Sequence, residues 1–150
     1  MGLDMYLTGK RYISAYGDDA ELRAKLKPLV EDITHGFDVK EISFEVFYWR
    51  KCNAIHRWFV DNVQDGEDDC KQYYVHRDSL KELLDTITKV LDNPDLVDEL
   101  LPPTEGFFFG STDIDEWYWA DLKVTKETLE SVLDKFAGDY GTDFYYRASW

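Results

Sequence analysis

The sequence predicts an α+β fold, with a small antiparallel sheet of three to four strands packed with four or so helices. Segments with alternating apolar side chains open the chain, recur near residue 44 and close the chain, and segments of helical periodicity separate them. An apolar content of 44% in 150 residues suffices for one core. Because neither a repeat nor a linker interrupts the sequence, we expect residues 1–150 to form a single α+β domain.

The first third of the chain predicts a strand, a helix and a second strand. Residues 5–13 alternate loosely and are rich in Tyr, Leu and Ile, as in an opening strand. Residues 20–34 have helical spacing, with Asp18 and Asp19 as the expected cap, and Pro28 predicts a kink or a later start. Residues 39–49 form the clearest strand. Its expected core-facing side chains are Ile42, Phe44, Val46 and Tyr48.

The period changes to that of a helix at Arg50, and this helix is expected to end near Val63. An acidic loop, a short extended piece around residues 73–75 and a helix over residues 78–91 follow. Two further helices are expected over residues 115–123 and 125–137, with a closing strand at residues 142–150. Residues 106–113 contain three successive phenylalanines and predict a buried extended run. The terminal strands are expected to pair in an antiparallel sheet with helices on one face.

Charge is distributed unevenly along the chain. Residues 1–60 contain nine Lys and Arg against nine Asp and Glu, whereas residues 61–150 contain eight against twenty-two. The entire net charge of -14 therefore lies after Val60. Such acidity opposes direct binding to duplex nucleic acid and favours attraction to a basic partner, although surplus carboxylates can also simply solvate a surface.

The fifteen residues just before this break form the first candidate site. Residues 46–60 contain no acid, three permanent cations, one histidine and five aromatic side chains. On a helix, Asn53 and His56 share a flank, where an amide and an imidazole could bind an anion, a nucleobase or a carbonyl group. The alternative is a structural helix whose polar pair is satisfied internally. The candidate ligand or interaction residues here are Trp49, Arg50, Lys51, Asn53, His56, Arg57 and Trp58.

A second candidate surface is the acidic aromatic segment 115–121. Trp117 and Trp119 point apart on a helix, so at least one ring should face solvent or press against another element. An exposed tryptophan among carboxylates is typical of a protein interface, and packing against the helix of residues 50–63 is the alternative.

Metal and cofactor chemistry gain little support. Cys52, His56, Cys70 and His76 have the right number for zinc but not a familiar spacing, and the loop at residues 61–72 lacks two positions of a calcium loop. No phosphate-binding glycine loop and no nucleophile elbow is found. We therefore expect no catalytic residue, no metal and no cofactor.

Three segments resemble a family of small uncharacterised bacteriophage and prophage proteins. They are Met1–Leu7 (MGLDMYL), Tyr48–Val60 (YWRKxNxIHxWFV) and Gly106–Thr112 (GFFFGST), with a further match at Leu100-Leu101-Pro102. The resemblance implies a setting inside a bacterium but no established activity. It also implies alanine at the place of Cys52, which argues against a metal or thiol role.

These observations predict an acidic, non-enzymatic accessory protein of phage type that binds a bacterial host protein. The expected partner has a basic surface, such as a nucleic-acid-handling or defence factor that the protein would inhibit. The alternative is a small-ligand or nucleotide-sequestering protein, or an enzyme, with its site around Asn53 and His56. The lack of a signal peptide and of a long apolar run predicts a cytoplasmic protein without membrane contact.

Overall fold

The two terminal strands pair at the centre of a four-stranded antiparallel sheet, as the sequence predicts. The structure, a computed structural model, describes residues 2–150. In it β1 (Asp4–Tyr12) lies between β2 (Glu41–Arg50) and β4 (Thr142–Ser149), and the short β3 (Tyr73–Val75) flanks β4. Met5 faces Ala148 and Leu7 faces Tyr146 across the central pair. The predicted α+β class is confirmed.

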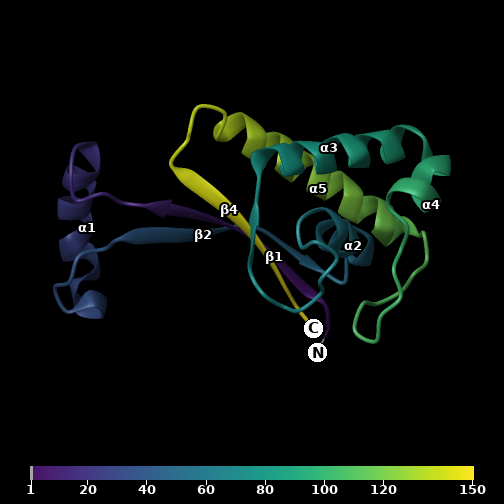
Figure 1. The fold of residues 1–150 in the computed structure, drawn as a ribbon, viewed down its shortest axis with the longest axis horizontal. Coiled ribbons are helices and arrows are strands. Elements are labelled where there is room, and N and C mark those ends of the chain that lie inside the picture. The colour runs from purple at the N-terminus through teal and green to yellow at the C-terminus, as the bar shows by residue number, and fades with distance from the viewer. Residues whose placement is uncertain (1) are drawn as a thin grey trace.

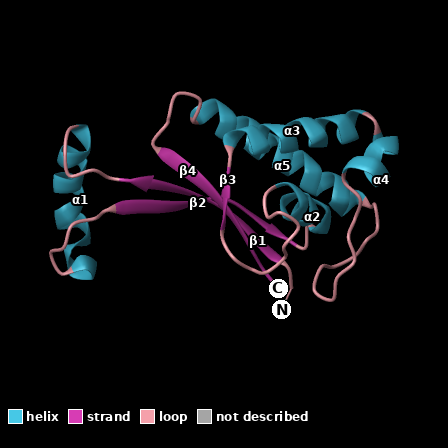
Figure 2. Cartoon of the chain, in the orientation of Figure 1, coloured by secondary structure: helices cyan, strands magenta, loops and turns pink. Residues whose placement is uncertain are grey.

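Helices cover one face of this sheet (Figures 1 and 2). They are α2 (Asn53–Asn62), α3 (Arg77–Asp92), the short α4 (Val97–Leu100) and α5 (Glu116–Lys135), with a 3-10 turn, η1, at Pro94–Leu96. α2 is the most enclosed, because seven of its ten residues are buried. None of the helices in residues 2–150 is both long and apolar enough to cross a bilayer.

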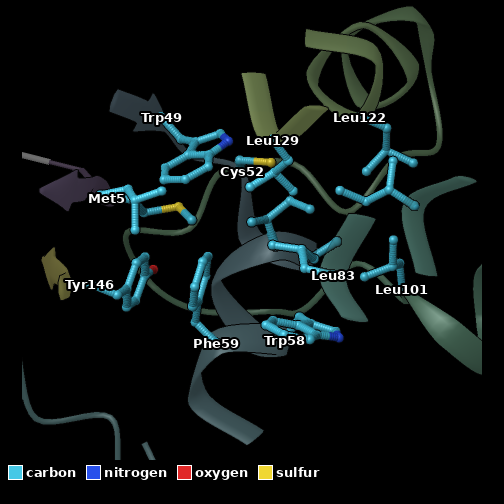
Figure 3. Close-up of a cluster of buried hydrophobic side chains, with 14 of the residues drawn as sticks. Met5, Trp49, Cys52, Trp58, Phe59, Leu83, Leu101, Leu122, Leu129 and Tyr146 are labelled. Carbon is cyan, nitrogen blue, oxygen red and sulfur yellow. The ribbon is translucent and has the colours of Figure 1, made fainter. Parts of the chain in front are cut away.

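The core lies between the sheet and these helices (Figure 3). Alternate side chains of β1 and β4 enter it from the sheet, and Phe59 of α2 stacks on the ring of Tyr146 with centroids 3.9 Å apart. Leu83 of α3 with Leu122 and Leu129 of α5 close the far side. Burial of such side chains contributes about 1.5–3 kcal/mol each.

A long arm projects from this body. The outer half of the β1–β2 hairpin extends away from the other helices, and α1 (Asp18–Thr34) lies across its end (Figure 1). None of the α1 residues is buried. Its polar contacts stay within the arm: the Arg23 guanidinium donates to the Val39 carbonyl at 3.0 Å, and Lys27 pairs with Asp38 at 3.4 Å.

The start of α1 differs from the sequence expectation. Gly17 is the N-cap, so Asp18 and Asp19 lie in the first turn, where their charges favour the positive end of the helix. The helix continues through Pro28. The Asp19 carboxylate accepts from Arg11 and from the Ser14 N–H, both at 3.0 Å, and so ties the helix to β1.

A β-bulge changes which side chains of β2 face the core. Leu7 is opposite Phe47 and Thr8 is opposite Glu45, so Val46 is the extra residue. After the bulge the alternation shifts by one residue. Trp49 is therefore buried and Tyr48 is 40% exposed, and the prediction that Tyr48 faces the core is wrong. Ile42 is exposed as well, because it lies in the outer half of the hairpin beyond the core, so its predicted core position is also wrong.

Two other expectations are wrong near the C-terminal third. α5 is one helix rather than two, because the Thr125 hydroxyl donates to the Asp121 carbonyl within the helix and Thr125 does not interrupt it. Asp115 is its N-cap and accepts from the N–H groups of Trp117 and Tyr118. Residues 106–113 form turns rather than a buried strand, and Phe107 is 96% exposed.

Candidate functional site

Asn53 anchors the loop that precedes α5. Its carboxamide nitrogen donates to the carbonyls of Phe109 and Ser111 at 3.1 and 2.9 Å, and its oxygen accepts from the Thr104 N–H at 2.9 Å. The side chain is buried and uses both donors and one acceptor. Asn53 therefore fixes residues 104–111 over the start of α2.

His56, one turn further along α2, lies at the centre of a buried polar chain. Its Nδ1 is 2.8 Å from the Tyr146 hydroxyl and its Nε2 is 2.9 Å from Asp68 Oδ2. A neutral imidazole that donates to the carboxylate and accepts from the hydroxyl satisfies all three groups. The Trp150 indole donates to the other Asp68 oxygen at 3.0 Å and extends the chain to the surface. Burial is the main cause that raises the pKa of Tyr146, so the phenol stays protonated.

Asn53 and His56 therefore do not share a hollow, although the sequence places them on one flank. The His56 ring packs edge-on against Phe109 at 5.1 Å between centroids, and it is only 1% exposed. Both side chains are held by partners more than ten residues away in the sequence.

A cavity of about 350 Å³ opens where β2, α2 and α5 meet. Arg50 and Lys51 line one side, and Trp117 and Tyr118 line the other. Lys51 has a left-handed backbone (φ 57°) that turns the chain from β2 into α2. Gly110 (φ 85°) packs on the Lys51 side chain, where an added Cβ would lie 3.1 Å from the Lys51 Cβ. The remaining lining residues are Cys52, Asn53, Ala54, Pro103, Ser111, Asp113, Asp115, Asp121 and Leu122.

The carboxylates in this cavity are already engaged. Asp115 caps α5, and Asp113 accepts from the Ser111 hydroxyl at 2.8 Å. Burial raises the pKa of Asp121, and nearby Asp115 adds to the increase while a hydrogen bond with Cys52 opposes it. Burial, followed by the charge of Asp121, raises the pKa of the Cys52 thiol well above its usual value. The thiol is therefore a poor nucleophile.

The other predicted site residues are divided between core and surface. Trp49 is buried and donates its indole N–H to Thr125 Oγ1 at 2.8 Å, and Trp58 packs edge-on against Phe59. Arg57 is exposed and pairs with Asp61 at 2.8 Å. Trp117 is 71% exposed, whereas Trp119 is half-buried against the core, so the two indoles do point apart.

Within residues 2–150, no group of three His, Cys, Asp or Glu side chains could hold a metal ion. Cys52 is buried, and His56 is engaged by Tyr146 and Asp68. Arg147 donates to the Cys70 carbonyl at the edge of the sheet, and the His76 ring packs against Tyr74.

Three large apolar side chains are exposed together on and just after α1. Leu29 and Ile33 are 78% and 80% exposed, and Phe37, just after α1, is 78% exposed. The sequence shows the helical spacing of the first two residues, but it does not reveal that α1 lies beyond the core.

Sequence reasoning also missed the partners of His56. Tyr146 alternates with Phe144 and Ala148 on β4, and a core-facing tyrosine requires a partner for its hydroxyl. That signal was present in the sequence. Nothing in the sequence marks Asp68 as a partner of His56, because Asp68 belongs to a run of acids that are expected to be solvated.

Comparisons of the chain with protein-family models, with curated proteins and with solved structures return no match. The class that fold and site define is an α+β protein with a half-covered antiparallel sheet and a projecting arm. Any function assigned to it therefore rests on its own geometry.

Proposed function

We propose that this protein is an acidic, non-enzymatic accessory protein of phage type that binds a bacterial protein. The observation that carries the proposal is the apolar side of α1, formed by Leu29 and Ile33 together with Phe37. Leaving large apolar side chains in water is unfavourable, and their burial by a partner contributes about 1.5–3 kcal/mol each. Exposed apolar patches of this kind mark interaction sites.

The geometry of the arm suits insertion into a groove. Leu29 and Ile33 are four residues apart and so lie one above the other on the helix, which is the spacing of anchors in helix-in-groove recognition. Because α1 is held away from the body, a partner can enclose it on several sides.

Charge indicates the chemistry of the partner. Asp32 flanks the anchors, and the body carries the entire net charge of -14 in residues 61–150. A protein with a basic surface around an apolar groove would be attracted by this negative charge before α1 docks into the groove. A nucleic-acid-handling or defence factor of the host has that character, and binding would inhibit it.

The test compares three forms of the protein in pull-downs from bacterial lysate at rising salt. Wild type should enrich a discrete protein at low salt. Leu29→Ser with Ile33→Ser should abolish the enrichment without unfolding the body, since both side chains are exposed. Trp117→Ser, a matched change of an exposed apolar side chain on the body, should retain it. No enriched partner at low salt, or equal enrichment by the α1 variant, would contradict the proposal.

The cavity beside Trp117 supports a second candidate function, the binding of a small anionic ligand such as a nucleotide. Its volume of about 350 Å³ is within the range of ligand sites, and Arg50 and Lys51 supply positive charge beside aromatic rings. Thermal-shift screening against nucleotides tests it, because a ligand at a hundred times its Kd adds about 2.7 kcal/mol of stability. An equal shift in Arg50→Ala with Lys51→Ala would rule the cavity out.

A further inference from the structure

The outer side of β2 is an open strand edge. β2 pairs with β1 on one side, and across residues 2–150 no strand pairs with its other side. Along such an edge every second residue turns its backbone N–H and C=O outward. Side chains from Glu41 to Val46 are exposed or half-buried, so solvent reaches this edge.

A groove of about 400 Å³ runs between this edge and α5. On the strand side it is lined by Phe44, Glu45 and Val46, which are three successive residues. Phe44 and Glu45 precede the bulge at Val46 and point to opposite faces of the sheet, so a hollow that touches both meets the strand at its edge. The outward backbone groups of β2 therefore face the groove.

The helix wall of the groove presents one face of α5. Thr128, Ser131, Val132 and Lys135 line it at the spacing of a single helical side, with Glu127 and Phe136 at its ends. The Phe136 ring lies parallel to the Phe44 ring, 6.0 Å away, and these rings make the apolar part of the groove.

Gly9 on β1 makes room for this arrangement. An added Cβ at Gly9 would lie 2.4 Å from the Phe44 Cζ, so only glycine lets the Phe44 ring cross β1 at this point. The ring that forms the groove is therefore positioned by close contact with the sheet backbone.

The charges in the groove favour a basic segment. Glu45 and Glu127 both line it, and among residues 2–150 neither forms a salt bridge. By contrast Glu130, one turn further along α5, pairs with Lys126 at 3.6 Å. Lys135 is the cation of the groove and lies two turns from Glu127.

We propose that the groove between β2 and α5 binds an extended peptide segment of a partner protein, which adds as a fifth strand to the edge of β2. Its main chain bonds the outward N–H and C=O groups of alternate residues between 42 and 45. Side chains on one face of the segment enter the groove against Phe44 and Phe136, where a Lys or Arg pairs with Glu127. A Lys or Arg on the other face of the segment pairs with Glu45. This mode of recognition combines backbone affinity with side-chain pockets.

In the register centred on Ser43, a second copy of the chain fits this edge less well. Antiparallel pairing of two β2 strands about Ser43 would place Glu41 of each copy opposite Glu45 of the other. Like charges directly opposite each other destabilise a sheet. The groove and α1 are different surfaces, so this inference does not depend on the proposed function.

The experiment selects binders from a displayed library of random nine-residue peptides on the full-length protein. Enriched peptides should alternate apolar residues and contain a Lys or Arg. Glu45→Lys and Glu127→Lys should each weaken binding roughly tenfold, whereas the matched reversal Glu130→Lys, outside the groove, should not. N-methylation of alternate peptide amides should abolish binding, and the bound peptide should slow hydrogen exchange of the outward-facing amides among residues 42–45.

Three results would overturn the inference. One is the absence of enrichment in the library, and another is enriched peptides that bind Glu45→Lys and wild type equally. The third is sedimentation showing that the free protein is a dimer whose β2 amides are already protected from exchange, because the edge would then be occupied by a second copy. Leu29→Ser with Ile33→Ser should leave peptide binding unchanged, which separates this outcome from that of the α1 proposal.

Discussion

Trp49 of β2 and Thr125 of α5 form a hydrogen bond in the core, with the indole nitrogen 2.8 Å from the threonine hydroxyl. The hydroxyl in turn donates to the Asp121 carbonyl at 2.7 Å, so it acts as donor and acceptor at once. This contact sets how α5 lies along β2. The cavity beside Trp117 is on one side of it and the β2–α5 groove on the other.

Replacing Thr125 with valine tests this contact. The change keeps the shape of the side chain but leaves the buried indole N–H without its acceptor, which should cost about 1–3 kcal/mol in the free energy of unfolding. Trp49→Phe should also destabilise the fold, but the double variant should cost less than the sum of both single changes, as coupled residues do. Urea denaturation measures all three. Additive losses would show that the pair is not coupled.

Asn53→Asp tests the anchoring of the loop at residues 104–111. The new oxygen faces the carbonyls of Phe109 and Ser111, which accept and cannot donate. We expect a loss of about 2–3 kcal/mol in unfolding free energy and faster proteolysis near Phe107. Limited digestion at neutral pH, with wild type as control, gives the result. Unchanged cleavage would mean that other contacts hold the loop.

His56→Phe should separate a structural role from a binding role. The phenyl ring fills a similar space but leaves the Tyr146 hydroxyl and the Asp68 carboxylate without their partner, so we expect a loss of about 2–4 kcal/mol. Trp150→Phe removes only the outermost bond of the chain and should cost less than 1 kcal/mol. Thermal unfolding compares the two. Equal stability of His56→Phe and wild type would contradict this description of the site.

Asp139 predicts a pH dependence of stability. Burial tends to raise the pKa of this carboxyl, but hydrogen bonds from the Thr142 side chain and from the N–H groups of Gly141 and Thr142 lower it overall. A lowered pKa contributes stability that is present above the unfolded value near 3.9 and lost as pH falls through the folded value. Asp139→Ala should therefore destabilise at neutral pH, and its difference from wild type should shrink in acid. The urea midpoints of Asp139→Ala and wild type, measured from neutral to acid pH, give the result. A difference that does not change with pH would contradict the prediction.

The sequence predicted the elements well where local pattern decides them. The terminal strands, their antiparallel pairing and β3 follow from alternation and from turn residues. It failed where a single residue changes the geometry. The bulge at Val46 places Trp49 in the core, where the alternation of the sequence predicted Tyr48. The hydroxyl of Thr125 bonds to a carbonyl of its own helix, so α5 continues past residue 125.

The site was harder to predict, because its partners are distant in the sequence. Helical spacing places Asn53 and His56 on one flank, but Phe109, Asp68 and Tyr146 decide what each side chain contacts. The exposure of the apolar side of α1 could not be predicted for a different reason. Its apolar periodicity resembles that of a core helix, and only the tertiary structure shows that the hairpin carries it away from the core.

The most direct test of the proposed function is photo-crosslinking in bacterial cells with a photoreactive amino acid at position 29. We expect one discrete adduct with a host protein at this position, weakened by Asp32→Lys, and none from the same amino acid at Lys89, on the exposed side of α3. No adduct at position 29, or equal adducts at both positions, would show that the apolar side of α1 is not the surface that binds a partner.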